Sequence, residues 1–286
     1  MLPNTFVSQI SSIYEDMVKW KKNLFCLPTG KAGKVFINLL GEWLGNYNKN
    51  NTFQCIAMKV VMVLPNLLLQ KPSPKSKAKE HTKALEERLN LWSQGNLQEL
   101  HRECKVLQNK LVSGKKRSSE DISRVFSKLV FEGKTGAALK FLDECSDNAV
   151  LPPTEDIVSK LKLLHPAPSE ITENTLLQGP LRPVPAAVFA SIDEQEVLKA
   201  ANHTKGSGGP SLLDAKQWRR ILGSKKYGKE GKELREEIAR FAKKIATSIV
   251  DPCTVEAYTA SRLIPLNKTS GEQDPIVRPI GVGRSF

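Results

Sequence analysis

Apolar residues recur at helical spacing over most of the chain, and this pattern predicts a mainly α-helical protein. Near the start, Phe6, Ile10 and Met17 fall on one helical face. A longer periodic stretch contains Gly95, where we expect the helix to break. The predicted helices cover residues 5–21, 35–44, 84–111, a helix pair within 118–145, 154–164, 192–202, 215–222 and 229–250.

The most apolar stretch, residues 56–69, contains Lys59 and Pro65. A helix that spans a bilayer needs about 20 apolar residues, so this stretch is too short. Pro65 is expected to end the helical pattern, because proline lacks the amide that an interior turn requires. We therefore expect no membrane partner.

In the last part of the chain, the spacing of apolar residues changes from that of a helix to that of β-strands. Two short runs rich in β-branched residues, 262–266 and 276–282, flank a polar connector with Gly271, Asp274 and Pro275. This arrangement predicts a β-hairpin with a long loop. Lys268 and Arg278 would lie near its two rims, where a point charge and a planar guanidinium suit a phosphate group.

Proline-rich and basic stretches divide the chain. A run with five prolines between 165 and 185 predicts an extended linker. We expect four regions: a helical leader over 1–112, a short helical region over 113–165, the linker with a short helix over 166–204, and a region over 205–286 that ends in the hairpin. The expected fold class is mainly α with a C-terminal β-hairpin.

The net charge of +13 and the pI of about 9.5 favour a polyanionic partner. One basic group lies in and around the helices of 215–222 and 229–250, and we expect it to contact phosphates rather than bases. Its members are Arg219, Arg220, Lys225, Lys226, Lys243 and Lys244. The basic segment 71–79 fits two interpretations equally, a solvated linker or a contact with a phosphate backbone.

Little in the sequence indicates a metal or cofactor. The five cysteines are odd in number and scattered, which is typical of thiols in a reducing compartment. His101 and Cys104 share a helical face, but no second pair of ligands lies near them in the sequence. Residues 29–34 contain two glycines and two lysines, yet their spacing does not match a phosphate-binding loop. With no signal peptide apparent, we expect an intracellular, soluble protein.

The C-terminal region resembles a known family. Arg262-Leu-Ile-Pro-Leu-Asn-Lys268, followed by Arg278-Pro-Ile-Gly-Val-Gly283, is similar to the first conserved block of the reverse transcriptases of non-LTR-type retrotransposons. The stretch 205–222, with a Gly-Pro turn, Asp214 and a helix, resembles the block before it. The family usually carries glycine where this chain has Leu212. Weaker likeness extends to 67–79 and 89–92.

This resemblance implies that residues 205–286 are the partial fingers region of a polymerase. In the family, the lysine and arginine of the fingers hairpin contact the triphosphate of the incoming nucleotide, and these roles would fall on Lys268 and Arg278. The palm carboxylates that hold two Mg²⁺ ions have no counterpart in this sequence. We therefore expect a chain truncated before the palm, without a cofactor and without activity alone.

Two functions remain open from the sequence. In the first, the chain is the N-terminal fragment of a reverse transcriptase that binds a nucleic-acid template, with nucleotide as a second ligand. In the second, it is a basic helical interaction protein, a retroelement remnant whose hairpin has lost its role. A two-stranded hairpin alone is marginally stable in water, so a hairpin without a palm to pack against is consistent with the second function.

Overall fold

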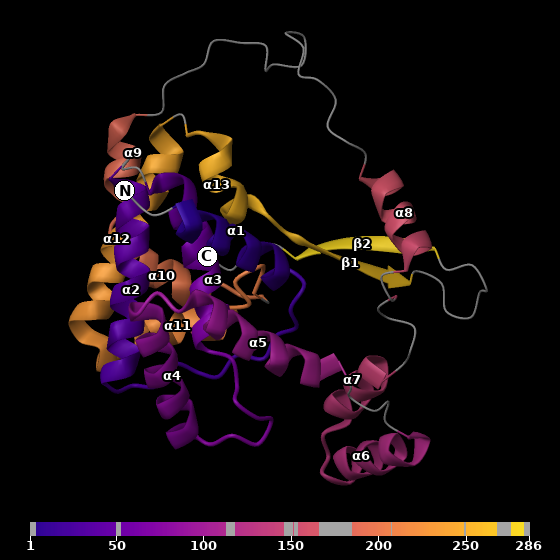
Figure 1. Cartoon of the computed structure of the whole chain (residues 1–286). Helices are drawn as coiled ribbons and strands as arrows, with labels where there is room; N and C mark the ends of the chain where they lie inside the picture. The colour runs from indigo at the N-terminus through magenta and orange to yellow at the C-terminus, as the bar shows by residue number, and fades with distance from the viewer. Residues whose placement is uncertain are drawn as a thin grey trace. The chain divides into compact units, whose positions relative to one another are not determined.

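The structure, a computed structural model, describes residues 4–49, 53–112, 118–145, 151, 154–165, 185–206, 208–248, 250–267 and 276–282. These residues group into two compact units, one drawn from 1–112, 182–262 and 282–286, and the other from 113–181 and 263–281. The helices and strands of both units are labelled in Figure 1. The mainly helical fold class with a C-terminal hairpin is confirmed.

The first unit is built mainly from helices among its described residues. The bounds of its longer helices are α1 Asn4–Met17, α2 Lys31–Asn48, α3 Gln54–Leu68, α4 Ala78–Ser93, α5 Leu97–Val112 and α12 Gly228–Thr247. Its shorter helices are α9 Ala186–Ala190, α10 Glu194–His203, α11 Ala215–Gly223 and α13 Pro252–Thr259, and the 3₁₀ helix η2 covers Lys225–Tyr227.

Helix α3 forms the centre of the first unit. Nearly every residue from Ile56 to Leu68 is buried, and α1, α2, α4, α5 and α13 all pack against it. Such a helix is apolar all round because each of its faces meets another helix. The uniformly apolar stretch of the sequence is therefore the core of the unit.

The expected break at Pro65 is wrong, because α3 continues past it to Leu68. A proline in the last turn removes its own amide hydrogen bond and crowds the carbonyl four residues before it. The surrounding burial, with Leu64 and Leu67 both fully inaccessible, outweighs that loss. The side-chain amide of Asn66 also donates to the Met62 carbonyl at 3.2 Å, which supports the same turn.

Helices α2 and α12 pack side by side, and the contacts between them show that they run in the same direction. Lys34 pairs with Glu230 near the two N-termini, at 3.1 Å. Toward the other end, the side-chain amide of Asn48 donates to the Glu237 carboxylate at 2.8 Å. Both N-termini therefore lie at the same end of the pair.

Most of the helices that the sequence predicts are confirmed. The break at Gly95 separates α4 from α5, and Asp214 caps α11 through the amide of Gln217 at 2.8 Å. The short helices α9 and α13 were not predicted. Arg235 of α12 is largely buried and pairs with Glu194 of α10 at 2.8 Å.

The second unit contains the helix pair and the hairpin. Its helices are α6 Ser119–Phe131, α7 Thr135–Cys145 and α8 Glu155–Leu164, and the strands are β1 Arg262–Asn267 and β2 Val277–Val282. The strands pair in a two-stranded sheet. The amide of Leu151 donates to the carbonyl of Pro265 in β1 at 2.9 Å. Across the described part of the chain, no helix has both the length and the apolar character needed to cross a bilayer.

Candidate nucleic-acid interface

The connector between α1 and α2, residues 18–30, brings distant basic segments together. Leu24 forms an antiparallel bridge with Gln70, just after α3. On either side of it, the Phe25 amide donates to the Leu69 carbonyl at 2.9 Å and the Lys71 amide donates to the Asn23 carbonyl at 2.8 Å. The lysines of the connector thus lie beside the basic segment that begins at Lys71.

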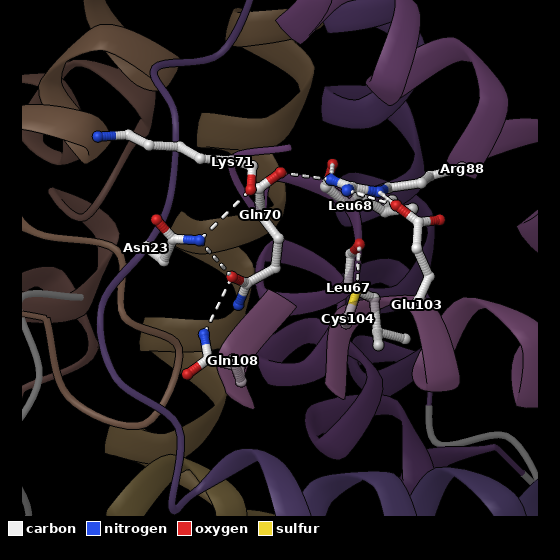
Figure 2. Close-up of polar contacts among 9 residues, drawn as sticks. All are labelled: Asn23, Leu67, Leu68, Gln70, Lys71, Arg88, Glu103, Cys104 and Gln108. Atoms are coloured by element: carbon white, nitrogen blue, oxygen red, sulfur yellow. Dashed lines mark hydrogen bonds and ion pairs between the residues drawn. The ribbon is translucent and has the colours of Figure 1, made fainter. Parts of the chain in front are cut away.

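A buried polar network holds this connector in place, as Figure 2 shows. The fully buried side chain of Gln70 accepts hydrogen bonds from Asn23 at 3.3 Å and from Gln108 at 3.0 Å. Gln108 in turn accepts from the Lys21 amide at 2.9 Å and donates to the Lys21 carbonyl at 3.0 Å. Because buried polar groups are costly when unpaired, these bonds fix the position of the connector.

Arg88 anchors the end of α3 in the same region (Figure 2). Its guanidinium is 1% exposed and donates to the carbonyls of Leu68 and Gln70, at 3.4 and 2.5 Å. Glu103 compensates the charge at 2.6 Å. The carbonyls at the end of a helix lack partners within the helix, and here a cation satisfies them.

The residues considered as metal ligands have other partners. The Cys104 thiol donates to the Leu67 carbonyl at 3.2 Å, and burial raises its pKa to about 12. His101 stacks on Trp20 and lies 3.2 Å from Asp16. Among the residues that the structure describes, no cluster of His, Cys, Asp or Glu could hold a metal ion.

The corner between α11 and α12 also packs against the connector. Arg220 donates through Nε to the Leu27 carbonyl at 2.9 Å, and the buried Tyr227 hydroxyl lies 2.9 Å from the same oxygen. Lys22 forms an ion pair with Asp214, the cap of α11. This packing brings the basic residues of the corner close to those of the connector.

Three basic segments therefore meet, and we call their combined cationic side chains the basic junction. All of them are exposed except Lys71, which is half-buried, and apart from Lys22 none forms an ion pair with a described carboxylate. Its members are Lys19, Lys21, Lys22, Lys31, Lys71, Lys75, Lys77, Lys79, Lys216, Arg219, Lys225 and Lys226.

Charge is unevenly divided between the two compact units. The residue ranges of the first unit hold 32 of the 43 Lys and Arg but only 18 of the 30 Asp and Glu. The ranges of the second unit hold the remaining 11 basic and 12 acidic residues. The whole excess of positive charge thus belongs to the unit that contains the basic junction.

The structure separates the six residues that the sequence predicts as backbone contacts. Arg219, Lys225 and Lys226 are exposed members of the basic junction, and Arg220 lies there with its Nε already bonded. Lys243 and Lys244 lie near the other end of α12, about 25 Å away at 1.5 Å per residue.

Lys244 has a structural role at that end. Its Nζ donates to the carbonyls of Tyr47 and Asn48, at 2.7 and 3.2 Å, and lies 4.7 Å from the centre of the Tyr47 ring. Burial lowers the pKa of this lysine. The ammonium group therefore satisfies the carbonyls at the end of α2, as Arg88 does for α3.

The residues linked to a triphosphate by resemblance can be placed only in part. Arg278 is exposed on β2. Lys268 lies outside the described residues.

Sequence reasoning missed Lys21, Lys22 and Lys31 as members of a basic surface. The sequence held a local signal, since Lys19, Lys21 and Lys22 lie in the first part of the short non-helical connector and Lys31 follows it directly. These lysines join a larger basic surface only through the bridge to Gln70 and the contacts with Arg220 and Tyr227. These partners are between 46 and 200 positions away in the chain.

Comparisons of this chain with models of protein families, with curated proteins and with solved structures found no match.

Proposed function

We propose that this chain binds the phosphate backbone of nucleic acid through the basic junction. The observation that carries the proposal is the convergence of three basic segments whose side chains are exposed and, among the described residues, almost without carboxylate partners. Unpaired cations on one protein region attract a polyanion and release its condensed counterions on binding.

The two parallel helices add to the positive potential there. The N-termini of α2 and α12 both lie beside the connector, and their cap residues, Gly30 and Tyr227, supply no side-chain acceptor. Each helix N-terminus carries roughly half a positive charge. Their parallel packing places two such partial charges at the same end as the basic junction, where the Glu230 carboxylate in the first turn of α12 is paired with Lys34 of α2.

Nucleic acid is favoured over other polyanions by the resemblance of residues 205–283 to the first blocks of reverse transcriptases. Leu212, where that family usually carries glycine, has φ of 59°, in the region that favours glycine. The loop before α11 thus has the backbone geometry that a glycine there would adopt. Under the same proposal, the exposed Arg278 serves a nucleotide triphosphate.

The test is a salt titration with a fluorescent 30-mer duplex oligonucleotide and the full chain. We expect binding whose affinity falls steeply with salt. The variants Lys75→Gln/Lys79→Gln and Lys225→Gln/Lys226→Gln each remove two exposed cations from a different segment of the basic junction. Each should weaken binding about tenfold or more near 100 mM salt and lower the salt slope by about 1.8.

A matched control removes the same charge elsewhere. Arg124→Gln/Lys162→Gln changes two exposed cations of the second unit and should leave the affinity within about twofold of wild type. Circular dichroism establishes that every variant is folded. An absence of binding by the folded wild type at 50 mM salt, or an equal loss in the control, would reject the proposal.

A second candidate function, binding of another protein or of an apolar ligand, is favoured by one groove. It has a volume of about 340 Å³ and lies between α10, α11 and α12. Its lining is mostly apolar and includes Val197, Trp218 and Ile238. This candidate would replace the first if the folded chain failed to bind oligonucleotide at low salt.

A further inference from the structure

The loop between α3 and α4 is exposed in its middle and fixed at both ends. At its start, the Lys71 amide donates to the Asn23 carbonyl at 2.8 Å. At its end, the Lys77 amide donates to the Glu80 carboxylate at 2.6 Å. Ser73 and Pro74 between these points are exposed, so the loop presents this dipeptide to solvent within the basic junction.

Ser73 is the one Ser or Thr of the full sequence that is followed directly by proline. Kinases that select this dipeptide accept a residue without an amide hydrogen after the target serine, a property that only proline has. Within the described residues, the Ser73 hydroxyl forms no hydrogen bond, whereas its carbonyl accepts from the Ser76 amide at 3.2 Å. The hydroxyl is thus free for transfer chemistry.

Ser76, in the same loop, differs from Ser73 both in the hydrogen bonds of its hydroxyl and in the residue that follows it. Its hydroxyl donates to the Ser73 carbonyl at 2.7 Å and lies 2.9 Å from Nε2 of His81. Lys77, not proline, follows it. Of the two loop serines, only Ser73 combines an unengaged hydroxyl with a following proline.

We infer that Ser73 is a phosphorylation site for a proline-directed protein kinase and that its phosphorylation weakens polyanion binding at the basic junction. The inference rests on the proposed function. In the transfer, the Ser73 oxygen forms a bond to the γ-phosphorus of ATP, the bond from that phosphorus to the β,γ-bridging oxygen breaks, and ADP leaves. The hydroxyl proton passes to solvent through the kinase.

The effect on binding follows from charge. A phosphoserine carries about −1.5 to −2 charges at pH 7 and three strong acceptor oxygens. Lys71 and Lys75 flank Ser73 at two positions on either side, so the new group would pair with cations that otherwise contact nucleic acid. It would also repel nearby phosphates of the ligand. Binding should lose about two counterion-releasing contacts.

The experiment treats the full chain with a proline-directed kinase and ATP, locates the phosphate by mass spectrometry, and measures affinity for the 30-mer duplex between 50 and 200 mM KCl. We expect one phosphate at Ser73, an affinity at least about tenfold lower near 100 mM KCl, and a salt slope smaller by about 1.8. Ser73→Ala should bind like the untreated wild type and should be unaffected by the kinase.

A charge-matched variant separates a local effect from a change in net charge. Ser73→Glu should weaken binding, whereas Ser8→Glu, on an exposed position of α1, should not. If Ser73 stays unmodified in the folded chain, or if the phosphorylated chain binds as tightly as the unmodified one, the inference is wrong and the proposed function stands. If the untreated wild type does not bind at 50 mM KCl, the proposed function itself fails, and the inference fails with it.

Discussion

At the residue scale, His81 reports on the electrostatics of the basic junction. Its ring stacks on Phe25 with centroids 4.6 Å apart, and Nε2 lies 2.9 Å from the Ser76 hydroxyl. Partial burial, followed by the positive charge of Lys71, lowers the pKa of His81, while Glu80 opposes the shift. The neutral ring is therefore favoured in the folded protein.

The first prediction concerns this pKa. In a proton NMR titration, His81 should titrate below 6.5, and Lys71→Gln should raise its pKa because a nearby cation is removed. The unfolded chain binds the proton more readily, so the contribution of His81 to stability is present above pH 6.5 and is lost as the pH falls through the folded pKa. A folded-state pKa at or above 6.5 would contradict the packing of this ring.

At the scale of elements, Gly33 determines how closely α2 can approach the connector. A Cβ at this position would lie 1.9 Å from the Pro28 carbonyl oxygen and 3.3 Å from the Tyr227 ring. The carbonyl belongs to the backbone and cannot move aside without displacing the connector. Only glycine permits this contact, which also positions the α11–α12 corner.

We therefore expect Gly33→Ala to destabilise the protein by about 2 kcal/mol or more and to weaken oligonucleotide binding, since the connector must shift. Urea unfolding followed by circular dichroism measures the first effect. Gly41→Ala, in the same helix, is the control, because its Cβ would lie 4.0 Å from Leu234. It should be neutral or stabilising by up to about 1 kcal/mol, since alanine favours the helix over glycine. Equal effects of the two variants would contradict this assignment.

At the scale of the whole molecule, burial is distributed as unevenly as charge. Helix α3 is buried along almost its entire length. In contrast, the structure describes no buried residue on α6, where Phe131 is 92% exposed. Elements with few buried apolar contacts open locally at low free energy.

Native-state hydrogen exchange should reflect this difference. Amides of α3 between residues 58 and 64 should exchange slowest, with opening free energies near that of global unfolding. Amides of α6 and α7 should exchange much faster, through local opening. Protection of α6 equal to that of α3 would show that α6 is covered in solution and would contradict its exposure here.

The sequence by itself determined most of the helices and the hairpin, because their signals are local. Spacing of apolar residues located α1, α2 and α12, and the capping residue Asp214 marked the start of α11. The apolar stretch of α3 gave no sign that Pro65 lies inside a helix, since only packing on all sides makes the proline tolerable. Likewise, no local signal identifies the partners of Arg235, because Glu194 and the Leu222 carbonyl reach it only in the folded chain.

For the candidate interface, the sequence determined the excess of positive charge and the basic character of two of its segments. Only the tertiary structure decided which cations act together. The Leu24–Gln70 bridge brings Lys71 beside the connector. Lys244, in contrast, donates to backbone carbonyls near the opposite end of α12. The physical reason is that charge is a property of each residue, whereas a binding surface depends on distances between residues far apart in the chain. Buried hydrogen bonds of the kind made by Gln70 and Arg88 set those distances.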